Sequence, residues 1–265
     1  MQVETVDFRY RELMIDAKLF LPDKLDTPVP LVVKLNGMQG QAPDKEKDRF
    51  APWLTKEGIG FLAYDYPGVR KSEGKFDYFS AQESIDFAIS LMMRDERINP
   101  LRIGLLGESF GGAMAIAHAA RDDRIRVLAL RSPVFDTAYI GKMQGFEMLY
   151  RIWLRTGEMR FHSMTSEELR EEFSVQTRYY NPSNLAGRIS IPVKMIVGGK
   201  DELLPIEGFR QLAEKLRIRD DKELYQEVDK ANHNFTVKTH FEKVAREFTA
   251  FFKQTLRPQE AWIQK

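Results

Sequence analysis

Short apolar runs alternate along this chain with segments whose apolar residues recur at helical spacing. The runs are nearly continuous, which is typical of strands buried on both faces of a parallel sheet. Strand following helix through most of the length predicts an α/β fold, with a mostly parallel central sheet covered by helices on both faces. The expected strands are 31–37, 58–67, 102–109, 126–133, 193–201 and 223–233, and the expected helices are 44–56, 85–93, 110–120, 205–216 and 244–256.

Two local signals refine this pattern near the amino end. The first twenty residues read as a hairpin of two extended runs that ends at Pro22. Ser80 and Glu83 have the spacing of a capping box, which predicts the start of the helix over 85–93.

One stretch interrupts the alternation. About fifty-five residues after Pro133 contain no clear strand, too many for an ordinary loop. We therefore expect a helical insertion over 135–187, between a first core part (1–134) and a second core part (188–265). Thr165 and Glu168 would cap one of its helices. Its large apolar residues are expected on one helical face: Tyr139, Met143, Phe146, Leu149, Tyr150, Trp153 and Leu154.

Composition excludes several classes of function. Forty Lys and Arg against thirty-nine Asp and Glu leave a net charge of +1, so the basic surface typical of nucleic-acid binding is not expected. The absence of cysteine excludes a disulfide framework, a thiolate metal site and a cysteine nucleophile. No segment reaches the roughly 18 apolar residues of a membrane span, and the amino end lacks the apolar core of a signal peptide. These features predict a cytoplasmic globular protein.

The strongest chemical signal is Gly107-Glu108-Ser109-Phe110-Gly111-Gly112, between an expected strand and an expected helix. A serine at a sharp strand-to-helix turn holds its hydroxyl exposed, and flanking glycines are needed because neighbouring chains crowd the turn. Ser109 is therefore the candidate nucleophile, and an idle serine in a glycine-rich turn is the alternative.

A serine hydroxyl needs a base and an orienting acid, in the chain order Ser, acid, His. His233 follows the last expected strand, where its loop can reach the carboxyl edge of the sheet, whereas His118, His162 and His240 do not follow strands. It is therefore the predicted base. The predicted acid is Asp201, at the end of the strand over 193–201, with Glu202 and Asp136 as alternatives.

An oxyanion formed on Ser109 needs backbone N–H donors. The motif supplies the N–H of Phe110, the residue after the nucleophile. The turn over 36–40 is expected to supply a second, from Met38, although the same residues also suit a plain turn.

At these residues the chain resembles the α/β-hydrolase family over nearly its whole length. Supporting the serine motif, the segment from Asp65 to Gly74 is similar to the loop after the fourth strand in esterases and peptidases related to dienelactone hydrolase and feruloyl esterase. The resemblance implies the α/β-hydrolase fold, with residues 135–187 as a small cap over the site. Two positions depart from the family pattern: Asn36 stands where many relatives have histidine, and Arg70 where they often have a second glycine.

These inferences predict a serine carboxylic-ester hydrolase that forms an acyl-enzyme, needs no cofactor or metal, and acts on small esters with short to medium acyl or aryl groups. An amidase or aminopeptidase, or a thioesterase or acyltransferase, would use the same triad. A binding protein without turnover is a further alternative, because fold does not fix function. The aromatic residues of the last helix allow a homodimer contact, although core packing also explains them: Phe241, Phe248, Phe251 and Phe252.

Overall fold

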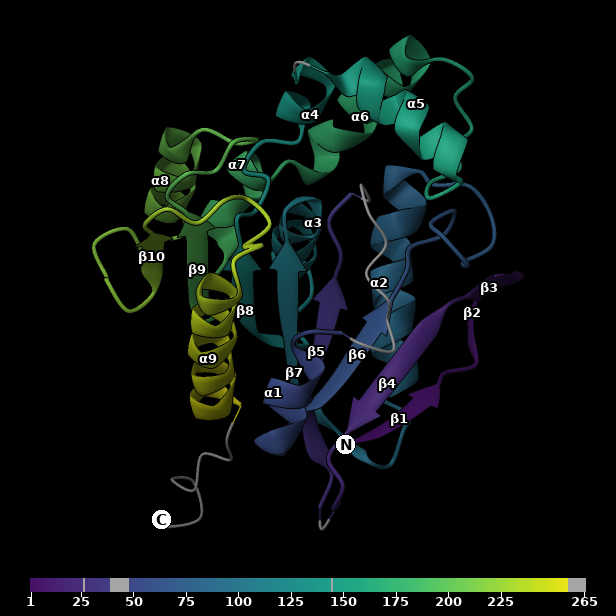
Figure 1. Cartoon of the computed structure of the whole chain (residues 1–265). Helices are drawn as coiled ribbons and strands as arrows, with labels where there is room; N and C mark the ends of the chain where they lie inside the picture. Colours follow the sequence, from purple (N-terminus) through teal and green to yellow (C-terminus); the bar gives the residue numbers. More distant parts are fainter. Residues whose placement is uncertain (26, 39–47, 144, 257–265) are drawn as a thin grey trace.

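A computed structural model describes residues 1–25, 27–38, 48–143 and 145–256 of the chain. Within them, eight strands form one sheet in the order β1-β4-β6-β5-β7-β8-β9-β10 (Figure 1). The six strands from β6 to β10 pair in parallel, and β4 and β1 add antiparallel strands at one edge. The strands are β1 (Gln2–Thr5), β4 (Ala17–Leu21), β5 (Val29–Leu35), β6 (Gly60–Tyr64), β7 (Ile98–Glu108), β8 (Ile125–Arg131), β9 (Val193–Gly198) and β10 (Tyr225–Val228).

The amino-terminal hairpin is only partly as predicted. β2 (Phe8–Tyr10) pairs with β3 (Leu13–Ile15), but the second extended run breaks at Asp16, and its remainder joins the main sheet as β4. The break has a polar cause, because the N–H of Asp16 donates to the Ser72 hydroxyl and its carbonyl oxygen accepts from the N–H of Asp65.

Helices cover both faces of the sheet, which confirms the predicted fold class. α1 (Ala51–Lys56) and α9 (Lys238–Thr255) pack on one face, and α2 (Tyr78–Met92), α3 (Phe110–Ala119) and α8 (Ile206–Lys215) pack on the other (Figure 1). The aromatic residues of α9 are at most 8% exposed, in the core beneath that helix. They are core residues of this chain and give no support to a homodimer contact.

Two helix starts differ from their predictions. Residues 44–47 lie outside the described residues, and α1 begins only at Ala51, with Pro52 in its first turn. Ahead of it the Asp48 carboxylate accepts the N–H of Phe50 and stabilises a turn there instead of a helix. The capping box at Ser80 is wrong as well: α2 starts earlier, and Asp77 caps it by accepting the N–H of Ser80 at 2.9 Å.

The chain between β8 and β9 is helical, and Figure 1 shows α4, α5 and α6 beyond the carboxyl ends of the central strands. Thr165 and Glu168 form the predicted capping box on α6. The predicted apolar face holds only in part, because Trp153 is 2% exposed whereas Leu154 is 50% exposed. Two separate helices, with Gly145 at φ 91° before the second, carry residues that were expected to share one face. The helices are α4 (Ala138–Lys142), α5 (Phe146–Thr156), α6 (Ser166–Tyr180), α7 (Pro182–Leu185) and the 3-10 turn η2 (Ala186–Arg188).

In the described ranges, no helix is both long enough and apolar enough to cross a bilayer.

Candidate active site

Ser109 lies at a sharp turn between β7 and α3, with φ 52° and ψ −119°. A positive φ is strained for a non-glycine residue, and such strain is typical of functional turns. The surrounding glycines permit the turn: a Cβ on Gly107 would lie 2.6 Å from the Gly111 carbonyl oxygen, and one on Gly111 would lie 1.9 Å from the Leu35 carbonyl oxygen. The glycine pattern of the motif therefore has a steric cause.

The structure brings Ser109, His233 and Asp201 together in one hydrogen-bonded series. His233 Nε2 lies 2.8 Å from Ser109 Oγ, and His233 Nδ1 lies 2.7 Å from Asp201 Oδ2. The three residues follow β7, β10 and β9, all at the carboxyl edge of the sheet. His233 and Asp201 are nearly fully buried, with side chains 3% and 1% exposed. The hydrogen bond between them therefore forms with little competition from water.

Local contacts fix the orientation of the acid and of the histidine loop. Asp201 Oδ1 accepts the N–H groups of Leu203 and Leu204, at 3.0 and 2.9 Å, which leaves Oδ2 directed at His233. Gly198 permits the close approach of the histidine loop, because a Cβ there would lie 2.7 Å from the Asn232 carbonyl oxygen.

The structure places the alternative acids and bases in other roles. The Glu202 carboxylate accepts the backbone N–H of His233 at 3.1 Å, so it supports the loop and does not contact the imidazole. Asp136 accepts from the Asn181 amide at 2.7 Å. His118 pairs with Asp122 at the end of α3.

Of the two expected oxyanion donors, Phe110 follows Ser109 in the chain and Met38 follows Gly37. Gly37 lies against Ser109, since a Cβ on Gly37 would be 3.1 Å from Ser109 Cβ and 3.7 Å from its Oγ. Met38 follows directly and is half-buried. Phe110 is the first residue of α3, and the first N–H groups of a helix have no partner within the helix. Residues 39 and 40 of the predicted turn lie outside the described residues.

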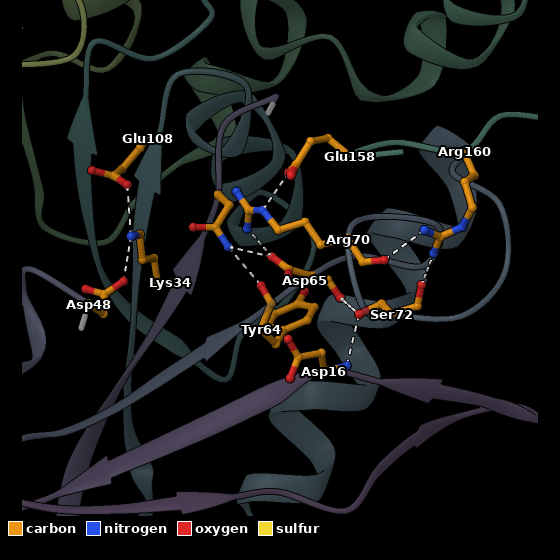
Figure 2. Close-up of polar contacts among 11 residues, drawn as sticks. Asp16, Lys34, Asp48, Tyr64, Asp65, Arg70, Ser72, Glu108, Glu158 and Arg160 are labelled. Carbon is orange, nitrogen blue, oxygen red and sulfur yellow. Dashed lines mark hydrogen bonds and ion pairs between the residues drawn. The ribbon is translucent and has the colours of Figure 1, made fainter. Parts of the chain in front are cut away.

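A buried charge network includes Glu108, the residue before Ser109, and sequence reasoning missed it. Lys34 Nζ lies 2.7 Å from Asp48 and 3.2 Å from Glu108, the residue before Ser109 (Figure 2). On the other side of Glu108, Arg131 Nε lies 2.7 Å from Glu108 Oε1, and Arg131 Nη1 donates to the Asn234 carbonyl oxygen at 2.8 Å. Arg131 thus joins the nucleophile strand to the loop of the histidine. The sequence signal is a charged residue in each of three apolar strands: Lys34 in β5, Glu108 in β7 and Arg131 in β8.

Burial and ion pairing shift the pKa values of Glu108 and Lys34 in opposite directions. Burial by itself would raise the pKa of Glu108, but Arg131 and Lys34 outweigh it and hold that pKa below its ordinary value of 4.5. Burial would likewise lower the pKa of Lys34, and Asp48 and Glu108 instead hold it above its ordinary value. Both groups are therefore charged at neutral pH.

The arrangement suits nucleophilic attack by a serine hydroxyl, with a base at hydrogen-bonding distance and an acid behind the base. Over the described ranges, no group of three or more His, Asp or Glu side chains is placed to hold a metal ion.

Known proteins resemble this chain in sequence and in fold. The model of the family described as "Prolyl oligopeptidase family" matches residues 53–259. An uncharacterized 31.7 kDa protein of Escherichia coli, from the traX-finO intergenic region, is 25% identical over 243 residues, covering 78% of this chain and 85% of that protein.

Among solved structures, the α/β hydrolase GrgF from Penicillium sp. sh18 has a TM-score of 0.69 at 19% identity, covering 97% of this chain and 99% of that one. Est1E from Butyrivibrio proteoclasticus, solved with ferulic acid, has a TM-score of 0.70 at 18% identity, covering 91% and 96%. The chain therefore has the α/β-hydrolase fold.

Proposed function

Because the chain belongs to the prolyl oligopeptidase family, we propose that it is a serine hydrolase that cleaves carboxylic esters with Ser109, His233 and Asp201. One observation carries the proposal: the hydrogen-bonded series from Ser109 Oγ through His233 to Asp201, with distances of 2.8 and 2.7 Å. These distances lie within the reach needed for proton transfer in the ground state.

In the first half of the reaction, Ser109 Oγ attacks the ester carbonyl carbon while His233 Nε2 takes the hydroxyl proton. The tetrahedral intermediate collapses when the bond to the alcohol oxygen breaks, and His233 returns the proton to that oxygen. In the second half, water attacks the acyl-enzyme while His233 takes its proton; the bond from the acyl carbon to Ser109 Oγ then breaks, His233 returns the proton to Oγ, and the acid leaves. Asp201 holds the imidazole in the tautomer that presents Nε2 to the serine and stabilises the imidazolium.

The negative charge of the intermediate would be received by the N–H groups of Phe110 and Met38. Gly37 supports this role for the loop, because it packs against Ser109 and so brings the next residue beside the reacting carbon. Removing one such donor typically costs about 3 to 4 kcal/mol of transition-state stabilisation.

Apolar residues around these groups favour uncharged esters with short to medium acyl or aryl chains. Met38, the residue after Gly37, is half-buried, and Leu203, two residues after Asp201, is 41% exposed. Phe135 follows Val134, whose N–H donates to the Ser109 carbonyl oxygen at 2.8 Å. Residues 135–187 would cover this region as a cap. The insertion's own aromatic residues contribute little to this argument, because they pack on one another, as Trp153 does on Phe161, or on aromatic residues of the core, as Phe173 does on Phe76.

The test is hydrolysis of p-nitrophenyl esters from acetate to decanoate by the wild type, Ser109→Ala and Ser174→Ala, together with labelling by a fluorophosphonate. Ser174 is an exposed serine of α6 and serves as the matched control. We expect turnover and labelling in the wild type and in Ser174→Ala, and neither in Ser109→Ala. The chain-length optimum would measure the acyl pocket.

Anilide and thioester substrates belong in the same panel, because the triad would serve those reactions too. Turnover of anilides or thioesters without esters would overturn the ester assignment and keep the triad. Labelling without turnover of any substrate would favour a binding protein.

A further inference from the structure

Arg70 connects the loop after β6 to the insertion through a buried pair of ion contacts. Its Nη1 donates to Asp65 Oδ1 at 2.8 Å, and its Nε donates to Glu158 Oε2 at 3.0 Å (Figure 2). The side chains of Arg70, Asp65 and Glu158 are 9%, 1% and 21% exposed. One guanidinium therefore compensates a buried carboxylate of the core and a carboxylate of the insertion, in the two-pronged geometry that arginine favours.

Backbone hydrogen bonds also join the loop after β6 to the insertion, at a contact that we call the junction. The N–H of Arg70 donates to the Glu158 carbonyl oxygen, and the N–H of Arg160 donates to the Gly68 carbonyl oxygen, both at 2.9 Å. The Arg160 guanidinium donates to the carbonyl oxygens of Arg70 and Ser72 (Figure 2). The insertion is thus fixed at residues 158–161 against the loop over 68–76. Arg70 itself has a φ of 45°, a strained conformation that persists only where the surroundings stabilise it.

The other end of this connection reaches the nucleophile. Asp65 Oδ1, which accepts from Arg70, also lies 3.5 Å from the Asn36 amide nitrogen, and that nitrogen donates to the Tyr64 carbonyl oxygen at 2.9 Å. Asn36 is 5% exposed and directly precedes Gly37, which packs against Ser109. The contacts therefore run from the insertion through Arg70 and Asp65 to the backbone beside the reacting hydroxyl.

We propose that Arg70 is a positioning residue for the oxyanion-binding backbone. It holds Asp65 in place, and Asp65 with Asn36 sets where the N–H of Met38 meets the developing charge. Glu158 fixes the same guanidinium from the insertion, so the insertion contributes to the alignment of the oxyanion loop through Arg70. This inference rests on the proposed ester hydrolysis.

The test replaces Arg70 by methionine, which keeps a long unbranched stem and removes the guanidinium. An oxyanion contact strengthens only in the transition state, so its misalignment lowers kcat and leaves KM nearly unchanged. We expect kcat on the best p-nitrophenyl ester to fall by about 10- to 100-fold, with KM changed by less than about 3-fold. Phenylboronic acid forms a tetrahedral adduct on the serine that mimics the intermediate. Its dissociation constant should rise by the same factor as kcat/KM falls.

Arg160→Met is the matched control, because it removes the second guanidinium of the same junction. Within the described chain, Arg160 donates to loop carbonyl oxygens and makes no hydrogen bond with Asp65. We expect its kcat to stay within about 3-fold of the wild type. Arg70→Lys keeps one charge but cannot hold Asp65 and Glu158 in the same forked geometry, so its kcat should lie between those of the wild type and Arg70→Met.

Arg70→Met leaves a buried carboxylate without this cation and could fail to fold, so the double variant Asp65→Asn with Arg70→Met is made beside it. This double variant has no charged side chain at position 65 or 70, and its kcat should still be at least about 10-fold below the wild type. A double variant with wild-type kcat, or an Arg70→Met protein whose KM rises at unchanged kcat, would overturn the inference while ester hydrolysis by Ser109 stands. A wild type with no turnover and no labelling overturns both proposals.

Discussion

Replacing Gly111 by alanine should displace the loop beside the nucleophile without altering any catalytic side chain. A Cβ at this position would lie 1.9 Å from the Leu35 carbonyl oxygen and 2.6 Å from that of Asn36. Both are backbone atoms, and they directly precede Gly37. To reach 3.0 Å from the Leu35 oxygen, the two chains must separate by about 1.1 Å.

A displacement of this size has unequal effects on rate and on stability. Misplacing a catalytic group by about 1 Å lowers the rate by roughly 100-fold. Crowding in a packed core lowers the free energy of unfolding by about 1 to 3 kcal/mol, and the higher helix propensity of alanine restores about 1 kcal/mol relative to glycine. We therefore expect Gly111→Ala to fold with a loss of about 0 to 2 kcal/mol in the free energy of unfolding, and to lose about 100-fold in kcat/KM.

The assay is p-nitrophenyl ester hydrolysis, with urea unfolding of the same preparations. Gly187→Ala is the matched control, because a Cβ at this exposed glycine of η2 meets nothing within 4 Å. It should match the wild type in both measurements. A folded Gly111→Ala protein within 3-fold of wild-type kcat/KM would refute the argument that close packing of α3 against this loop aligns the site.

Two further substitutions test the acid and the buried network. Asp201→Asn should lower kcat by about 10⁴-fold while the protein stays folded, because the amide no longer selects the productive tautomer of His233; a loss below 10-fold would assign the role of the acid to another carboxylate. Glu108→Gln should lower the free energy of unfolding at pH 7 by about 3 to 5 kcal/mol, since Lys34 and Arg131 lose a buried partner. The pKa of Glu108 is held below its ordinary value, so its contribution is present above pH 4.5 and is lost as the pH falls below that value. In urea unfolding, the gap between this variant and the wild type should therefore narrow from pH 7 to pH 3.5, and a constant gap would contradict the assignment.

The sequence predicted the parts of this molecule that local sterics decide. The glycines around Ser109 mark a turn that no bulkier residue fits, so the motif places the nucleophile by itself. Asp201 and His233 could be predicted to lie together because each follows a strand within a few residues, and the carboxyl ends of parallel strands meet at one edge of the sheet. Helix α6 begins where its capping box lies, because both of its hydrogen bonds join residues three positions apart.

Predictions failed where distant partners decide the outcome. The predicted capping residue, Ser80, is not the cap, because the helix begins earlier and Asp77 caps it by accepting the N–H of Ser80. Its supposed partner Glu83 instead contacts Tyr10 and Arg11, more than seventy positions away. Arg70 and Glu158 are 88 positions apart, and neither has a local pattern that names the other. Helical periodicity likewise put Leu154 on the buried face, because spacing alone does not show where one helix ends and the next begins.

The two long-range arginine contacts that the sequence does not reveal both lie near Ser109, and they indicate what holds the surrounding loops in place. Arg131 joins the nucleophile strand to the loop of His233, and Arg70 joins the loop after β6 to the insertion. In both cases an arginine contacts a carboxylate near Ser109. Arg131 contacts Glu108, which precedes Ser109 in the chain, and Arg70 contacts Asp65, which lies near Asn36 in the loop beside Ser109. Buried ion pairs contribute little net stability over apolar packing, and their best-attested role is to fix one arrangement among several. Close packing of glycines therefore explains the sharp turn at Ser109, whereas we propose that the two arginines hold the loop of His233 and the loop after β5 against it.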